Sequence, residues 1–236
     1  MTYTIVARCP RTRQLGIGIA TYSICVGLYC NGLRANVGAT MTQAFVNQGN
    51  NPLALRLLAQ GFTPAHVLDE LRANDPDTEY RQIALIDREG TAVGYTGPKT
   101  RGHASHRTGP GSVAMGNVLA GPEVVDAIAD AFAATDAGEA LERRLLRAIE
   151  AGRDAGGQAG NDGHLPERSA ALLVYGDHDH AELDIRVDLH DQAVDELRRA
   201  FEEYDLYRGY YRDRGRNPRD AVPQDVFVAG LGRAAA

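Results

Sequence analysis

Apolar and polar positions alternate over residues 2–8 and again over 15–21, which predicts two strands joined by a turn at 10–13. In the second strand, Gly16 and Gly18 fall on one face and the larger side chains on the other. Two glycines on one face of a strand indicate a close approach by another backbone, a helix or a ligand. The pattern is compatible with either tight packing or a bound ligand against the glycine face, and we favour packing.

Further periodic segments follow along the chain. Strands or extended segments are expected over 23–29, 34–43, 80–87, 91–95, 113–115, 169–175 and 183–187, and helices over 52–60, 63–74, 139–151 and 192–204, with another starting at 121–122. Long polar loops are expected over 96–111 and 154–167. Short turns between paired strands predict antiparallel sheets with segregated helices, an α+β fold.

The length of 236 residues fits one domain, with or without an appendage. We expect a main domain over residues 1–205 and a Tyr- and Arg-rich appendage over 206–236, which packs on the core or on a second subunit. A homodimer is therefore the expected oligomer.

The net charge of −6 argues against nucleic acid or an anionic membrane as the main partner. No apolar run approaches the roughly 18 residues of a membrane span, and the N-terminus lacks a secretory signal pattern. A cytoplasmic protein is expected. Cys9, Cys25 and Cys30 form no Cys-x-x-Cys pair, so reduced thiols are expected and no cofactor is indicated.

Thr2 is the first residue with candidate chemistry. Initiator methionine is normally removed before a side chain as small as threonine, which leaves a free α-amine beside a hydroxyl. An α-amine with a pKa of about 7.7–8.0 can serve as general base for its own hydroxyl. A threonine at the start of the processed chain therefore predicts an enzyme that cleaves amides. The alternative is that Thr2 merely starts an edge strand.

Such chemistry also needs a cation near the amine and donors for an oxyanion. Lys99 is the only lysine in the sequence, so Arg81 or Arg168 would have to supply the charge, unless both form structural ion pairs. Gly116 and Asn117, expected at a strand end, are the candidate oxyanion donors, with a structural turn asparagine as the alternative.

Other polar residues are candidates for binding substrate. Thr42 and Gln43 end a predicted strand and can line a pocket, while Thr21 and Ser23 can orient the amine. His103 and His106 can bind a substrate carboxylate or a metal, but two histidines three apart are a weak signal. The sequence lacks a strong metal motif, and we expect no metal.

Seven blocks occur in a familiar order. They are residues 1–21, 38–45, 81–97, 116–132, 143–157, 169–176 and 187–201. Over roughly residues 2–204 they resemble the bacterial and archaeal family called domain of unknown function 1028. That resemblance implies the N-terminal-nucleophile hydrolase superfamily, a four-layer αββα sandwich with two antiparallel sheets between helix layers, and the residue that starts the mature chain as nucleophile.

Two departures from the family pattern bear on substrate preference. The usual Gly-Gly-Asp motif reads Gly-Gly-Gln at 156–158 and is followed by an insertion, so Asn161 or Asp162 would have to replace the aspartate. The loop after Gly97 also lacks the family's tryptophan.

The first hypothesis is an amidohydrolase that cleaves a small amide or peptide-like substrate through an acyl-enzyme on Thr2. The second is a catalytically silent binding or scaffolding protein with the same fold. A metal-dependent hydrolase using the histidines is the third.

Overall fold

The computed structural model describes residues 1–231 of the 236-residue chain. The chain forms two compact units, Met1–Leu197 and Arg198–Ala236.

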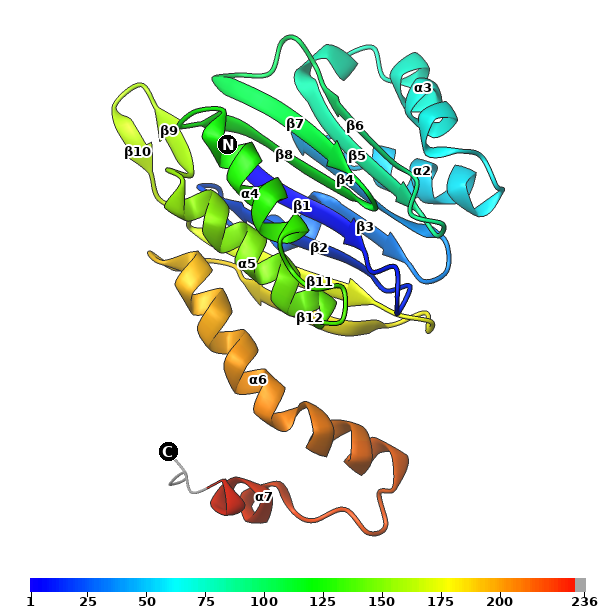
Figure 1. The fold of residues 1–236 in the computed structure, drawn as a ribbon, viewed down its shortest axis with the longest axis vertical. Coiled ribbons are helices and arrows are strands. Elements are labelled where there is room, and N and C mark those ends of the chain that lie inside the picture. Colours follow the sequence, from blue (N-terminus) through cyan, green and yellow to red (C-terminus); the bar gives the residue numbers. More distant parts are fainter. Residues whose placement is uncertain (232–236) are drawn as a thin grey trace. The chain divides into compact units, whose positions relative to one another are not determined.

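A large antiparallel sheet, sheet A, carries the N-terminus (Figure 1). Its strand order is β10-β9-β8-β1-β2-β11-β12, and β7 also pairs with β8. The strands are β1 Thr2–Arg8, β2 Leu15–Thr21, β7 His103–Gly109, β8 Ser112–Leu119, β9 Gln158–Gly160, β10 Gly163–Leu165, β11 Ser169–Tyr175 and β12 Ala181–Val187. The first strand is therefore flanked on both sides, by β8 and β2.

A second antiparallel sheet, sheet B, has four strands in the order β3-β4-β5-β6. They are β3 Asn31–Arg34, β4 Gly38–Ala44, β5 Arg81–Asp87 and β6 Ala92–Thr96. The helices are α1 Val26–Tyr29, α2 Asn50–Ala59, α3 Pro64–Asn74, the 3-10 helix η1 Thr78–Tyr80, α4 Glu123–Ala133, α5 Leu141–Asp154, α6 Ala193–Arg216 and α7 Gln224–Gly230. The predicted α+β class with antiparallel sheets is confirmed.

One hydrophobic cluster joins the two sheets, with Val6 and Met115 from sheet A and Met41 and Ile86 from sheet B among its members. Side chains alternate between the two faces of a strand, so Thr2 and Thr4 share with Val6 the face of β1 that looks toward sheet B. The first strand thus places two hydroxyls between the sheets.

Helices pack on the other faces of both sheets. Helices α2 and α3 contribute Leu58 and Leu71 to a cluster with Ile83 and Leu85 of β5. Helix α5 covers the two glycines of β2, where a Cβ on Gly18 would lie 2.8 Å from Ile149 Cγ1. The glycine face therefore serves close packing against a helix.

Several local predictions were wrong. Residues 96–111 are not one loop, because strand β7 occupies 103–109, and residues 154–167 contain the hairpin β9–β10. The short helix α1 lies within 23–29, and helix α6 continues past residue 204 to Arg216. The polar composition of β7 hides a strand that is stabilised by its pairing with β8, since strand formation depends strongly on context.

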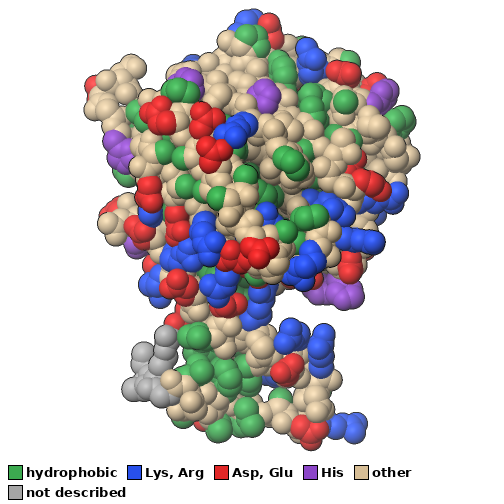
Figure 2. All heavy atoms as spheres, in the orientation of Figure 1, with side chains coloured by type: hydrophobic (Ala, Val, Ile, Leu, Met, Phe, Trp, Pro, Cys, Tyr) green, Lys and Arg blue, Asp and Glu red, His purple; other side chains and the backbone are tan. Residues whose placement is uncertain are grey.

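The second unit carries an aromatic cluster on α6 and α7. The rings of Tyr210 and Phe227 are stacked with centroids 4.3 Å apart, and Tyr207 stacks on Tyr211 at 5.7 Å. Hydrophobic side chains also gather on this part of the chain in the space-filling view (Figure 2). Among the helices of residues 1–231, none combines the length and apolar character needed to cross a bilayer.

Candidate functional site

Thr2 lies at the start of β1, where its side chain is nearly buried, with 6% of the residue exposed. Its hydroxyl donates to the carbonyl oxygen of Met1, and so does the hydroxyl of Thr21 from the end of β2. The two hydroxyl oxygens are 3.3 Å apart. Two threonine hydroxyls therefore converge on one carbonyl oxygen.

The α-amine of Met1 lies in the same place and donates to Oδ1 of Asn117 at 2.6 Å. Burial lowers the pKa of this amine to about 6, because the charged form loses its hydration, and the nearby Cys30 opposes the shift. The nitrogen of Thr2 itself is a peptide amide while Met1 is attached. It gains a basic lone pair only when Met1 is removed.

A buried chain of side-chain amides fixes the orientation of Asn117. Its Nδ2 donates to Oε1 of Gln82 at 2.9 Å, which leaves Oδ1 for the amine. Gln82 Oε1 also accepts from Gln43 Nε2 at 2.9 Å, and Gln43 Oε1 accepts from the hydroxyl of Thr4 at 2.6 Å. These four side chains are at most 1% exposed, and their bonds cross from one sheet to the other.

The amide nitrogen of Gln82 also has hydrogen-bond partners. Its Nε2 lies 2.8 Å from the carbonyl oxygen of Gly116, 3.0 Å from Thr96 Oγ1 and 3.1 Å from the carbonyl oxygen of Ser105. Sequence reasoning missed Gln82. The available signal was the position of this polar residue directly before the apolar residues 83–86 of a predicted strand.

Of the residues expected at the site, Thr21, Ser23, Gln43 and Asn117 lie together with Thr2. Ser23 contributes its backbone N–H, which donates to Thr21 Oγ1 at 3.2 Å, so it helps to orient that hydroxyl. Gln43 reaches the site through Gln82.

Gly116 and Asn117 were expected at a strand end, and this was wrong, because both lie inside β8. Gly116 has strand partners on both sides, Tyr3 on β1 and Ser105 on β7. Backbone amides at such positions are used within the sheet, so the Gly116 N–H is not placed to receive an oxyanion.

Thr42 does not line the site. It neighbours Gln43 on β4 and therefore points to the opposite face of sheet B, where its register partner Ile83 packs against α2 and α3. Its hydroxyl is buried and has no hydrogen-bond partner among the described residues. The expectation that it forms the same pocket as Gln43 was wrong, because adjacent strand residues face opposite ways.

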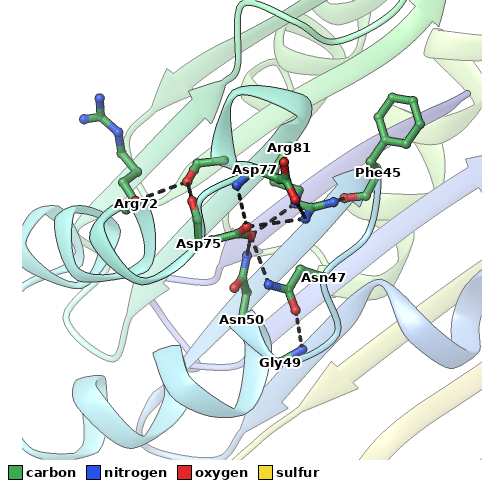
Figure 3. Close-up of polar contacts among 9 residues, drawn as sticks. Phe45, Asn47, Gly49, Asn50, Arg72, Asp75, Asp77 and Arg81 are labelled. Atoms are coloured by element: carbon green, nitrogen blue, oxygen red, sulfur yellow. Dashed lines mark hydrogen bonds and ion pairs between the residues drawn. The ribbon is translucent and has the colours of Figure 1, made fainter.

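Arg81 lies in a separate polar cluster around Asp75 (Figure 3). Its Nε is 3.1 Å from Asp75 Oδ2, and its Nη1 donates to the carbonyl oxygen of Phe45 at 2.5 Å. Burial acts to raise the pKa of Asp75, but hydrogen bonds from Arg81 and Asn47 outweigh it and lower that pKa. Within residues 1–231 no contact joins Arg81 to Met1 or Thr2, and its role is structural.

Arg168 lies beside the site without reaching the amine. Its backbone N–H donates to the carbonyl oxygen of Thr21 at 2.8 Å, and its guanidinium lies over the ring of Tyr22 at 5.4 Å. Neither arginine contacts the amine in the part of the chain that the structure describes. The pKa of the Met1 amine is therefore lowered by burial and not by either arginine.

His103 and His106 lie on β7, which β8 separates from β1. His106 Nδ1 is 2.9 Å from Thr96 Oγ1, and burial lowers the pKa of this imidazole. In the described chain, neither histidine contacts Thr2, and no three His, Cys, Asp or Glu side chains are grouped to hold a metal ion.

At residues 156–158, where the sequence departs from the family's Gly-Gly-Asp motif, a glutamine lies near the site. Gln158 is fully buried, and its Oε1 accepts from the backbone N–H of Tyr22 at 3.0 Å. Asn161 and Asp162 are exposed between β9 and β10, so neither side chain lies in the interior with Gln158.

Comparison with known proteins gives a family match over most of the chain. The sequence model of a family described as "Family of unknown function (DUF1028)" matches residues 2–197. The structure is similar to the crystal structure of protein SPO2555 from Silicibacter pomeroyi, described with the same family, with a TM-score of 0.77 and 29% identity over 86% of this chain and 85% of that chain. None of the curated proteins matches this chain.

A more distant likeness is to Anbu (ancestral beta-subunit) from Yersinia bercovieri. Its TM-score is 0.41 and its identity is 12%, over 86% of this chain and 94% of that chain. This similarity is too low to support an inference.

The amide network generates a stability prediction. Gln82→Leu should lower the free energy of unfolding by about 2–4 kcal/mol, because it leaves buried polar groups of Asn117 and Gln43 without partners. Gln60→Leu, at an exposed position after α2, should change it by less than about 0.5 kcal/mol. Urea unfolding followed by circular dichroism measures both, and equal effects would show that the network contributes no special stability.

Proposed function

We propose that this chain, which belongs to the DUF1028 family, is an N-terminal-nucleophile amidohydrolase once Met1 has been removed. The observation that carries the proposal is the convergence of the Thr2 and Thr21 hydroxyls on the carbonyl oxygen next to Thr2. The fold supports it as well. Two facing sheets with α4 and α5 against one and α2 and α3 against the other correspond to the αββα sandwich that the family resemblance implies.

The proposed reaction uses the two groups of Thr2. Its α-amine takes the proton of Oγ1 as this oxygen attacks the carbonyl carbon of a small amide or peptide-like substrate. The tetrahedral intermediate then releases the amine product, which leaves with the proton returned by the α-ammonium. A water molecule, deprotonated by the same α-amine, hydrolyses the resulting ester on Oγ1.

The position of the Met1 carbonyl oxygen suggests where the substrate oxygen binds. After Met1 leaves, this position is free, and it is within hydrogen-bond reach of Thr21 Oγ1. We propose Thr21 as an oxyanion donor in place of Gly116. Donors placed before the reaction begins stabilise developing charge strongly, and the loss of one typically costs about 10²–10³ in rate.

The amide network positions the base. Asn117 Oδ1 faces the N-terminal amine because Gln82 holds the other end of the Asn117 amide. Burial lowers the pKa of the Met1 amine, and we expect it to lower the pKa of the Thr2 amine as well, because Thr2 is itself nearly buried. Asn117 therefore acts as a neutral acceptor that orients the amine, and it favours the charged form less than a carboxylate would.

The silent alternative rests on one specific feature. While Met1 is attached, the Thr2 nitrogen is an amide and the two hydroxyls are occupied by the Met1 carbonyl. A protein that keeps Met1 would lack the base and act only by binding. The state of the mature N-terminus therefore separates the two functions.

Substitution of Thr2 tests the proposal. Thr2→Ala should lose at least about 10³ of the hydrolytic rate, since the nucleophile is absent, whereas Thr2→Ser should keep measurable activity. The assay combines intact-mass analysis with a panel of short peptides, N-acyl amino acids and cyclic amides. Alanine, serine and threonine are all small enough for Met1 removal, so the three proteins are matched. Undiminished turnover by Thr2→Ala would eliminate the proposal.

The burial of the amine predicts the pH dependence of kcat/KM. The base must be neutral, so activity should fall as pH drops through the pKa of the Thr2 amine, which burial places below the ordinary value of about 8. Asn117→Asp should move this acid limb to higher pH, because a carboxylate beside the amine favours its charged form. If the acid limb of the kcat/KM profile lies at the same pH in Asn117→Asp as in the wild type, the assignment of the amine as base is wrong.

A further inference from the structure

The opposite end of β1 opens on a cavity that the proposed reaction does not use. Arg8 follows Thr2, Thr4 and Val6 on the same face of the strand, and six residues of strand place it about 20 Å from Thr2. The cavity has a volume of about 530 Å³ and is lined by Arg8, Arg13, Leu15, Asn36, Arg88 and Glu89.

The charges around this cavity do not balance. Glu89 is paired with Arg88, whose Nε lies 2.7 Å from Oε1 of the carboxylate. Arg8 and Arg13 form no ion pair with any residue in the described range 1–231, and the Nε of Arg8 is buried without a hydrogen-bond partner. A buried donor without a partner is costly, so the lining has an excess of about two positive charges and an unmet hydrogen-bonding demand.

The surrounding backbone holds the two arginines in place. Arg13 has a φ of 64°, in the left-handed region, and its N–H donates to the carbonyl oxygen of Cys9 at 2.9 Å. The N–H of Arg8 donates to the carbonyl oxygen of Gly111 at 2.9 Å. Gly90, with a φ of 94°, passes close to the Arg8 side chain, and its Cβ would lie 3.5 Å from Arg8 Cδ. An arginine in a strained turn conformation is a feature found at ligand sites.

We propose that this cavity is a second binding site, for a small dianion whose negative charge lies on oxygen atoms, as in phosphate monoesters and dicarboxylates. Guanidinium groups match both kinds of oxygen anion with charge-assisted hydrogen bonds. The volume lies in the range of small-molecule sites. The site goes beyond the proposed amide hydrolysis, since none of its lining residues belongs to the Thr2 cluster.

Calorimetric titration of the full chain with inorganic phosphate, and separately with succinate, tests the proposal at constant ionic strength. The wild type should bind at least one of the two anions. The anion that binds with the higher affinity shows whether the site prefers a phosphate or a dicarboxylate. Arg8→Gln and Arg13→Gln should each weaken this binding at least about tenfold. Arg56→Gln removes the same charge from an exposed position on α2 outside the cavity and should leave the affinity within about twofold.

Three outcomes would overturn the proposal. They are no binding of either anion by the wild type, unchanged binding in both cavity variants, and an equal loss in Arg56→Gln. Circular dichroism checks that each variant is folded. Arg13 is exposed, so Arg13→Gln decides the question if Arg8→Gln fails to fold. Thr2→Ala should bind the anion as the wild type does, which separates this site from the proposed catalytic one.

Discussion

The candidate site depends on the hydrogen bonds of one buried glutamine. Gln82 comes from sheet B, and its Oε1 accepts from Asn117 of sheet A and from Gln43 of its own sheet. Gln43 in turn accepts from Thr4, two residues along the strand that Thr2 begins. The side-chain polar atoms of Thr4, Gln43, Gln82 and Asn117 all have hydrogen-bond partners, a condition under which such networks specify a single arrangement. The position of Asn117, and with it the surroundings of the N-terminal amine, follows from that arrangement.

Burial, and not a nearby cation, lowers the pKa of the Met1 amine. The sequence suggested that Arg81 or Arg168 lowers the pKa of the amine, but Arg81 is bound to Asp75 and Arg168 lies over Tyr22. The Met1 amine instead donates to the neutral Asn117, and desolvation by burial lowers its pKa. The same burial at Thr2 would suit the proposed N-terminal base, because a neutral amine needs no other group to remove its proton.

The sequence predicted the parts of this site that depend on local pattern. Alternation placed β1, β2 and β11 at the bounds that the structure has, and it put Thr2 at the head of a strand. The opposite orientations of Thr42 and Gln43 were also readable from alternation, once Met41 is known to face sheet A. Gln82 was not predictable in this way, since its partners are 35 and 39 residues away along the chain. Strand β7 was missed for a similar reason, because its pairing partner rather than its polar composition makes it a strand.

In the proposed function, the hydroxyl of Thr2 becomes a nucleophile when the chain begins at that residue. Labelling with a β-lactone, which acylates reactive hydroxyls by ring opening, followed by peptide mass mapping, tests whether this hydroxyl is reactive. We expect one acyl group per chain, carried by an N-terminal peptide that begins at Thr2. A chain that begins at Thr2 and stays unlabelled, or that carries the label on a different residue, would contradict this expectation.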